Sequence, residues 1–281
     1  MLPLAVCNHK GGTGKTTSVA HIAAALGLSG HQTLVVDLDP QGFLSRMLGI
    51  PEAAREDTAL ALFEHDREPG EVHIFEMSGF DLIPSSSLLT KRMRSLNKPT
   101  DVLWVKESIE SGLLDREYDV VLFDTAAAVT VFSLNALVAS RHALIPVLPE
   151  YQGVVGAEQT FQTIRLIRKR LNPRLQRTHF LFTQVDGRKG IHQSYRQYMR
   201  RKYEDHVLDT IIRTSTSLAE SYEDGTTLFD HDPQARGARD YANVTDELMR
   251  RIQAEADAAA AADSAAPIPD ASTPTPETLN S

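Results

Sequence analysis

Two lysines, three glycines and two adjacent threonines stand close together near the start of the chain. The segment reads Lys10-Gly11-Gly12-Thr13-Gly14-Lys15-Thr16-Thr17. Glycine carries no Cβ, so main-chain N–H groups can turn toward phosphate oxygens there. A lysine after the last glycine adds a positive charge, and the next hydroxyl can bind Mg²⁺. The spacing predicts a loop that binds the phosphates of ATP or ADP, with Lys15 on the β- and γ-phosphates and Thr16 on the metal.

A strand and a helix must flank such a loop. Residues 4–7 form a short apolar run before it, and residues 16–28 follow with apolar side chains at Val19, Ile22 and Leu26. Strand, glycine-rich loop and helix is the order that a phosphate-binding loop requires. The N-terminus of the helix would add its positive dipole at the same point. The alternative is a glycine-rich turn without a ligand, and the flanking elements argue against it.

Carboxylates end two further apolar runs. The run at 33–37 leads into Asp37-Leu38-Asp39-Pro40-Gln41-Gly42, and the run at 119–124 ends at Asp124. Acidic groups at the carboxyl ends of parallel strands face the ligand crevice, and carboxylate oxygens suit Mg²⁺. Asp124 is therefore predicted near the metal, and Asp37 is expected to face the same crevice. Alternatively, Asp39 could begin a helix as its N-cap, and Asp124 could be an ordinary strand-end residue.

The fold class follows from the alternation of strands and helices. The strand-like runs are short, apolar and not alternating, as in a parallel sheet covered on both faces. We expect strands at residues 4–7, 33–37, 119–124, 143–148 and 179–183, with 80–83 near an edge. We expect helices at residues 16–28, 102–114, 157–171, 192–203 and 243–253. The prediction is an α/β fold, a doubly wound and mostly parallel sheet flanked by helices, as in P-loop NTPases.

A change in composition near residue 253 marks the predicted end of the globular domain. Residues 254–281 are rich in Ala, Asp, Pro and Thr, with five acidic residues and no Lys or Arg. Few large apolar groups are available there to offset the entropy of ordering, so we expect a disordered acidic tail. Residues 1–253 form the single predicted domain. The Ala run at 258–262 could extend its last helix by a turn or two.

Composition excludes several classes of protein. The only cysteine is Cys7, which rules out an intramolecular disulfide and a metal site built on several cysteines of one chain. No run of about 18 apolar residues occurs, and the start of the chain lacks a basic leader, so we expect neither a membrane span nor a signal peptide. The predicted location is the cytoplasm.

The glycine-rich segment resembles the deviant Walker A motif of the ParA/MinD family of P-loop ATPases, most closely that of Soj-like ParA proteins. Similar patterns continue at Asp37 to Gly42 and further along the chain, over about residues 1–250. In that family a lysine at the position of Lys10 crosses a dimer interface to the partner's nucleotide. The resemblance implies a homodimer around Mg-ATP, catalytic roles for Lys10, Lys15 and Asp39, and Mg²⁺ held near Thr16, Asp37 and Asp124. Asp39 would orient the attacking water.

The sequence departs from the family pattern at two places. His9 stands where the strict Walker A pattern has its first glycine. The strand-end Asp124 is followed by Thr125 and then by Ala126, Ala127 and Ala128, where the family usually has prolines. The second departure bears on how rigid the adjoining segment is and on the rate of hydrolysis.

Basic residues concentrate in one part of an otherwise acidic chain. Residues 161–202 contain twelve Lys and Arg residues and one acid, Asp186, whereas the whole chain has a net charge of −8. Several cations on one surface suit DNA binding without sequence preference, and no helix-turn-helix is apparent. A solvated basic face balanced by acids elsewhere is the alternative. The residues expected to contact DNA are Arg165, Arg168, Lys169, Arg188, Lys189, Arg196, Arg200 and Arg213.

These features together predict an ATP-dependent partition ATPase. Such a protein dimerises around Mg-ATP, binds DNA non-specifically on the nucleoid and releases it when a ParB-like partner stimulates hydrolysis. A MinD-like membrane ATPase would need a basic amphipathic C-terminus, which the acidic tail does not offer. Another cargo-positioning ATPase would share every motif described. An ATP-dependent amide-forming or ring-forming ligase is a third alternative, although it would not need the basic residues.

Overall fold

The computed structural model describes residues 1–50, 53, 55–64, 72–112 and 117–264 of the chain. Its strands are β1 (Leu2–Val6), β2 (Thr33–Asp37), β3 (Phe75–Glu76), β4 (Asp81–Ile83), β5 (Val120–Asp124), β6 (His142–Val147) and β7 (Arg177–Phe182). The first helices are α1 (Lys15–Leu28), α2 (Phe43–Met47), α3 (Leu89–Met93), α4 (Trp104–Glu110) and α5 (Val131–Ala139). They are followed by α6 (Tyr151–Arg170), α7 (Gly190–Tyr203), α8 (Ser217–Glu223), α9 (Leu228–His231) and α10 (Arg236–Ser264). Short 3₁₀ helices occupy Arg55–Asp57, Ala59–Phe63, Pro99–Val102 and Glu204–His206.

The seven strands form one sheet in the order β3-β4-β2-β5-β1-β6-β7. All neighbours are parallel except the edge pair β3 and β4. Every residue of β2, β5 and β6 is buried, which explains why these segments are continuously apolar rather than alternating. The mostly parallel, doubly wound α/β fold expected from the sequence is confirmed.

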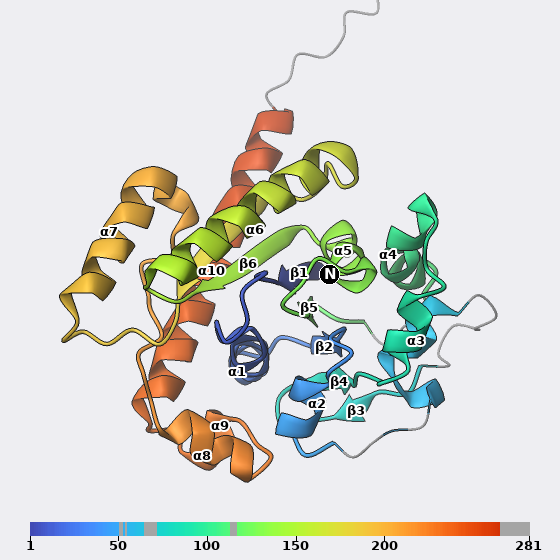
Figure 1. Ribbon diagram of the computed structural model, residues 1–281, viewed down its shortest axis with the longest axis horizontal. Coiled ribbons are helices and arrows are strands. Elements are labelled where there is room, and N and C mark those ends of the chain that lie inside the picture. Colours follow the sequence, from blue (N-terminus) through green and yellow to red (C-terminus); the bar gives the residue numbers. More distant parts are fainter. Residues whose placement is uncertain (51–52, 54, 65–71, 113–116, 265–281) are drawn as a thin grey trace, which may run out of the picture. The chain divides into compact units, whose positions relative to one another are not determined.

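Helices cover both faces of the sheet (Figure 1). On one face α4, α5 and α6 lie side by side, and α1 lies on the other face, where it contacts α2 and α9. The core between these layers contains the fully buried rings of Phe63, Phe123, Phe132 and Phe180. Those large side chains give the sheet a firm support on which loops at the carboxyl ends of the strands can be held.

The C-terminal end of α1 packs directly against the turn between β3 and β4. A Cβ atom added to Gly27 would lie 1.6 Å from the main-chain oxygen of Gly79. No side chain fits at that distance, so glycine is required at position 27 by the approach of two backbones. This contact fixes the position of the C-terminal end of α1, the helix that follows the glycine-rich loop, against the β3–β4 turn.

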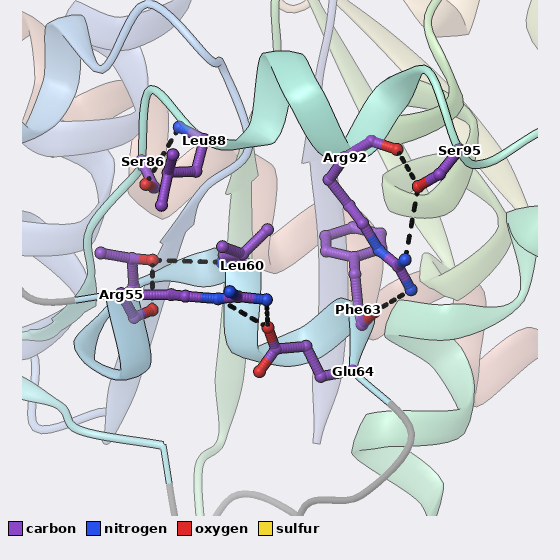
Figure 2. A network of polar contacts seen from close by, with 9 residues as sticks. Arg55, Leu60, Phe63, Glu64, Ser86, Leu88, Arg92 and Ser95 are labelled. Atoms are coloured by element: carbon purple, nitrogen blue, oxygen red, sulfur yellow. Dashed lines mark hydrogen bonds and ion pairs between the residues drawn. The ribbon is translucent and has the colours of Figure 1, made fainter.

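Polar contacts tie the segment between β2 and β4 to helix α3 (Figure 2). Arg55 donates to Glu64 Oε1 from Nη2 at 2.6 Å and from Nε at 3.0 Å. Arg92 donates to the carbonyl oxygen of Phe63 at 2.5 Å and to Ser95 Oγ at 3.3 Å, and its guanidinium lies over the Trp104 ring. The buried Phe63 is thereby held against α3.

The structure adds elements that periodicity does not predict. Helix α5 begins at a capping box formed by Thr130 and Ser133, but its continuous apolar sequence resembles a buried strand as much as a helix. The last helix begins at Arg236, seven residues before the predicted start at 243. Within the described residues, no helix combines the length and the apolar character that crossing a membrane requires.

The described residues up to 247 form one compact unit, and residues 248–264 belong to a second. Helix α10 continues through the Ala run to Ser264, so the first eleven residues of the predicted tail at 254–281 are helical. Alanine has the highest helix propensity of all residues, which accounts for this extension. Residues 265–281 lie outside the described residues, and the domain boundary at 253 stays a prediction.

Candidate functional site

The glycine-rich loop connects β1 to α1 at the carboxyl edge of the sheet. Gly12 has φ 74° and Gly14 has φ 82°, both in the left-handed region. Gly14 is also the N-cap residue of α1, whose first residue is Lys15. A side chain at either glycine would be strained, so the backbone itself requires these residue types. The loop thus enters the helix with main-chain N–H groups at the helix start, which is the arrangement that binds anions.

Residues at the end of β7 anchor this loop. Thr183 Oγ1 donates to the carbonyl oxygen of Thr13 at 2.8 Å, and Gln184 Nε2 donates to that of Gly12 at 2.9 Å. Gln184 itself has φ 51°, a conformation that is uncommon for a residue with a side chain. Both hydrogen bonds use carbonyl oxygens of the loop, so they hold its shape without consuming its N–H groups.

Lys15 is a buried cation at the start of α1. The residue is 7% exposed, and Nζ donates to the carbonyl oxygen of Lys10 at 3.3 Å. Burial lowers the pKa of Lys15, and the nearby carboxyl groups of Asp124 and Asp39 oppose that shift. Burial raises the pKa of the Cys7 thiol to about 12. A desolvated ammonium group next to a ring of N–H groups is suited to binding phosphate.

Asp37 and Asp124 are both fully buried at the ends of their strands. Thr16 Oγ1 donates to Asp124 Oδ2 at 2.8 Å, and Asp124 Oδ1 has no hydrogen-bond partner among the described residues. Burial raises the pKa of Asp37 to about 7, and burial together with the neighbouring Asp37 raises the pKa of Asp124 well above its usual range. An orphaned buried carboxylate oxygen beside a hydroxyl fits a Mg²⁺ ion, because a cation would offset this cost. The predicted metal set of Thr16, Asp37 and Asp124 is thus gathered in one place.

Asp39 lies at the start of the segment between β2 and α2. Its Oδ1 accepts from the N–H of Gln41 at 2.9 Å, and its carbonyl oxygen accepts from Ser85 Oγ at 2.5 Å. The N-cap residue of α2 is Gly42. Asp39 therefore closes a turn and does not cap that helix. Asp37, in turn, accepts from the N–H of Asp39 at 3.1 Å. The backbone of Asp39 is therefore hydrogen-bonded to the Asp37 carboxylate.

A cavity of about 580 Å³ opens over the glycine-rich loop. Besides residues 11–17 it is lined by the predicted catalytic residue Asp39 and by Ala127. The remaining lining residues are Phe43, Arg46, Met47, Gln184 and Tyr222. The size suits a nucleotide. The sequence does not identify α2 or Tyr222 as part of this cavity, because a short helix after Gly42 and a lone tyrosine carry no motif.

Lys10 lies on a different side of the loop from Lys15. Its ammonium group donates to Gln152 Oε1 of α6 at 3.0 Å, and its N–H donates to Asn8 Oδ1 at 3.0 Å. A Cβ added to Gly156 would approach the Lys10 side chain at 3.1 Å, so α6 passes close beside it. Lys10 therefore projects along the N-terminal part of α6.

The eight predicted DNA-contacting residues fall into two groups. Arg165, Arg168 and Lys169 lie together on α6 and, with Pro173, line an open cavity of about 340 Å³. None of these three cations forms an ion pair within the part of the chain that the structure describes. The other predicted residues lie on or near α7 and beyond it, namely Arg188, Lys189, Arg196, Arg200 and Arg213.

Most of the second group is engaged within the chain. Arg188 pairs with Asp186 at 3.0 Å, Arg200 pairs with Asp209 at 2.8 Å, and Arg213 pairs with the buried carboxylate of Asp240. Burial and the neighbouring Arg200 lower the pKa of Arg196. The structure thus brings three of the predicted cations together on α6, whereas three others form ion pairs with carboxylates.

Comparison with known proteins agrees with this geometry. A family model described as an AAA domain matches residues 1–177. The chromosome-partitioning ATPase Soj of Thermus thermophilus is 33% identical over 251 residues, covering 89% of this chain and 96% of the relative. The chromosome partitioning protein ParA of Myxococcus xanthus is 30% identical over 250 residues, covering 88% of each chain.

Solved structures of similar fold cover most of this chain. A cobyrinic acid a,c-diamide synthase from Mycobacterium smegmatis, with bound ATP analogue and magnesium, has a TM-score of 0.75 and 28% identity over 89% of this chain and 95% of that one. A plasmid partition protein from Borrelia burgdorferi bound to AMPPNP has a TM-score of 0.73 at 20% identity, covering 89% of this chain and 100% of that one, a likeness of fold alone. With its glycine-rich loop, its strand-end carboxylates and relatives over most of its length, the chain belongs to the ParA/MinD family of P-loop ATPases.

Proposed function

We propose that this chain is an ATP-dependent partition ATPase that dimerises around Mg-ATP, binds DNA without sequence preference and releases it on hydrolysis. The observation that carries the proposal is the arrangement at the carboxyl edge of the sheet. There Lys15, the Thr16–Asp124 pair and the cavity over the loop meet at one point. The partition role is supported by the Soj and ParA relatives, which match over most of their length.

In this proposal the loop residues 10–17 bind the phosphates of ATP or ADP. Main-chain N–H groups and the Lys15 ammonium contact phosphate oxygens, while Thr16, Asp37 and Asp124 hold magnesium directly or through its waters. Magnesium, when bound, neutralises charge on the phosphoryl group that is transferred. Asp39, at the cavity wall, orients the attacking water. The products are ADP and phosphate, and turnover is slow without a partner.

The position of Lys10 supports dimerisation. Its side chain extends along α6 and bonds to Gln152, rather than pointing inward as Lys15 does. A cation that lies on the surface next to the loop can reach the nucleotide of a second copy, where it stabilises charge on the phosphoryl group. The closed dimer would therefore contain two nucleotides, each contacted by the partner's Lys10.

DNA binding is best supported at the unpaired cations Arg165, Arg168 and Lys169 of α6. Cations already held by carboxylates, such as Arg188 and Arg213, gain less by contacting phosphate, because they must first leave their partners. A dimer doubles the number of cations that can meet phosphate. DNA binding then depends on ATP, because only the ATP-bound dimer presents enough cations to bind DNA tightly. A ParB-like protein is the proposed partner that stimulates hydrolysis.

A second function is favoured by one observation. The Mycobacterium smegmatis structure named a cobyrinic acid a,c-diamide synthase is 28% identical to this chain. This similarity favours an ATP-dependent amide-forming reaction as the alternative. Such an enzyme would consume ATP with a small carboxylic acid and an amide nitrogen donor, and it would not respond to DNA. MinD of Pyrococcus horikoshii and McdA of Cyanothece share the fold at 21% and 20% identity. Another cargo-positioning ATPase would use the same sequence motifs.

The test is DNA binding by the wild type and by Lys15→Ala, with ATP or ADP, at two salt concentrations. We expect tight binding only for the wild type with ATP, and a loss of at least tenfold between about 50 and about 200 mM salt. Equal binding with ATP and ADP would contradict the ATP-dependent dimer. ATP turnover that requires a small acid and ignores DNA would instead support the amide-forming alternative.

A further inference from the structure

His21 is buried in α1, about one helical turn after Thr17, and both of its ring nitrogens are hydrogen-bonded. Nδ1 lies 2.8 Å from the carbonyl oxygen of Thr17, and Nε2 lies 3.1 Å from the main-chain nitrogen of Leu228. The N–H of Leu228 can only donate, so Nε2 accepts and carries no proton. Nδ1 therefore carries the proton and donates to Thr17. The two contacts define a single neutral tautomer.

The bond to Leu228 closes the start of another helix. Leu228 is the first residue of α9 and is fully buried. The first N–H groups of a helix have no partner within it, and a buried one must find a partner elsewhere. His21 supplies that partner from a residue 207 positions earlier in the chain. The imidazole therefore joins α1 to α9.

Aromatic rings surround the imidazole on its remaining sides. Tyr241 of α10 stacks on it with ring centroids 4.8 Å apart, and Tyr222 of α8 meets it edge-on at 6.2 Å. Phe229 of α9 lies 6.3 Å away. Burial among these groups lowers the pKa of His21 to about 4 and raises the pKa values of Tyr222 and Tyr241. All three titratable groups are neutral near pH 7.

Two of the groups around His21 also line the nucleotide cavity. Thr17 ends the loop that would bind phosphates, and Tyr222 forms part of the wall beyond it. We infer that His21 is a positioning residue for nucleotide binding: by joining Thr17 to Leu228, it holds the Tyr222 wall of the cavity at a fixed distance from the glycine-rich loop. The inference rests on the proposed binding of ATP and ADP in this cavity. Tyr222 would contact the nucleoside part, since the phosphates occupy the loop.

Two amide substitutions separate the two hydrogen bonds of the imidazole. In His21→Asn the amide can replace Nδ1 and donate to Thr17, but it is too short to reach Leu228. In His21→Gln the amide oxygen can replace Nε2 and accept from Leu228. Titration calorimetry with Mg-ADP and with magnesium pyrophosphate compares a nucleotide with its phosphates alone. Thermal unfolding of each variant checks that the chain is folded at the assay temperature.

We expect His21→Asn to weaken ADP binding about tenfold, equivalent to roughly 1.4 kcal/mol, while pyrophosphate binding changes less than about twofold. His21→Gln should restore ADP binding to within about threefold of the wild type. Equal ADP affinity in all three proteins would overturn the inference. So would a parallel loss of ADP and pyrophosphate binding, because His21 would then act on the loop alone.

A second variant covers the case in which His21→Asn does not fold. Tyr222→Leu removes the aromatic wall and leaves His21 in place, and it should weaken ADP but not pyrophosphate binding. Unchanged ADP affinity in this variant would overturn the role assigned to the wall. Wild-type protein that binds neither ligand would contradict the proposed function itself. That result is distinct from every outcome in which the wild type binds both.

Discussion

Asp37 and Asp124 occupy the same register position on neighbouring parallel strands, with β2 and β5 ending side by side. Two buried carboxylates in this relationship repel each other, and burial alone already disfavours their charged forms. Thr16 and Ser45 each donate to one of them, at 2.8 Å in both cases, which relieves part of the cost. The structure without a cation therefore holds unfavourable electrostatic free energy at this point.

Replacing Asp124 by Asn should separate stability from metal binding. The amide oxygen can still accept from Thr16, while the charge that burial and Asp37 disfavour at this position is removed. The free energy of unfolding of the metal-free protein should therefore rise. Magnesium affinity in the presence of ADP should fall about 10–100-fold, as for loss of a group that orients a metal's ligands. Urea unfolding and magnesium titration measure the two effects. A less stable metal-free protein would contradict the repulsion.

Lys10→Ala should separate nucleotide binding from dimerisation. The Lys10 ammonium group is bonded to Gln152 of the same chain, so its loss should change ADP affinity less than about twofold. ATP-dependent dimers, measured by analytical ultracentrifugation, should disappear because the cation offered to the partner's nucleotide is gone. Gln152→Ala is the matched control and should still dimerise. If Lys10→Ala forms dimers with ATP as the wild type does, its predicted role across the interface is wrong.

The two groups of basic residues should differ in their effect on DNA binding. Replacing Arg165, Arg168 and Lys169 by Ala removes these cations from both copies of the proposed dimer. It should weaken DNA binding at every sequence and reduce the slope of log affinity against log salt by up to about 5, or about 0.9 for each phosphate that is no longer neutralised. Arg188→Ala, which removes a cation already paired with Asp186, serves as the control and should change the slope by less than about 0.5. Fluorescence anisotropy at several salt concentrations measures both slopes. Equal slopes in all variants would exclude α6 as the DNA-binding surface.

His21 should make stability depend on pH. Its pKa is about 4 in the folded chain against 6.5 when unfolded, so between these values the unfolded chain binds more protons. Stability from this group is complete above about pH 6.5 and is lost as pH falls toward 4, by roughly 2–3 kcal/mol at pH 4.5. Urea unfolding of the wild type and of His21→Gln at pH 7 and 4.5 measures it. The wild type should lose more stability than the variant, and equal losses would show that His21 does not titrate in this window.

The sequence predicts the parts of this site that local chemistry defines. Glycines with positive φ, a lysine at the helix start and acids at strand ends each carry their own signal, and the structure gathers Lys15, Thr16, Asp37 and Asp124 as expected. What it does not predict depends on contacts between distant segments. Tyr222 and the bond between His21 and Leu228 arise only after α8 and α9 have packed on α1.

The basic residues illustrate the same limit. Composition shows that cations are abundant in residues 161–202, but not which of them face a carboxylate. Asp209 and Asp240, the partners of Arg200 and Arg213, lie after the basic region in the sequence and meet it only in the folded chain. A count of charges therefore overstates the number of cations available to DNA.

The hydrogen bonds from Thr183 and Gln184 to the loop bear on when the protein becomes competent during its synthesis. They join residues 170 and 172 positions apart, and the ribosome produces the loop long before its anchors. A nascent chain that has passed residue 30 has the whole glycine-rich segment but neither anchor. Nucleotide capture should therefore begin only after β7 and its following loop have emerged, so an unfinished chain would not withdraw ATP or compete with complete protein.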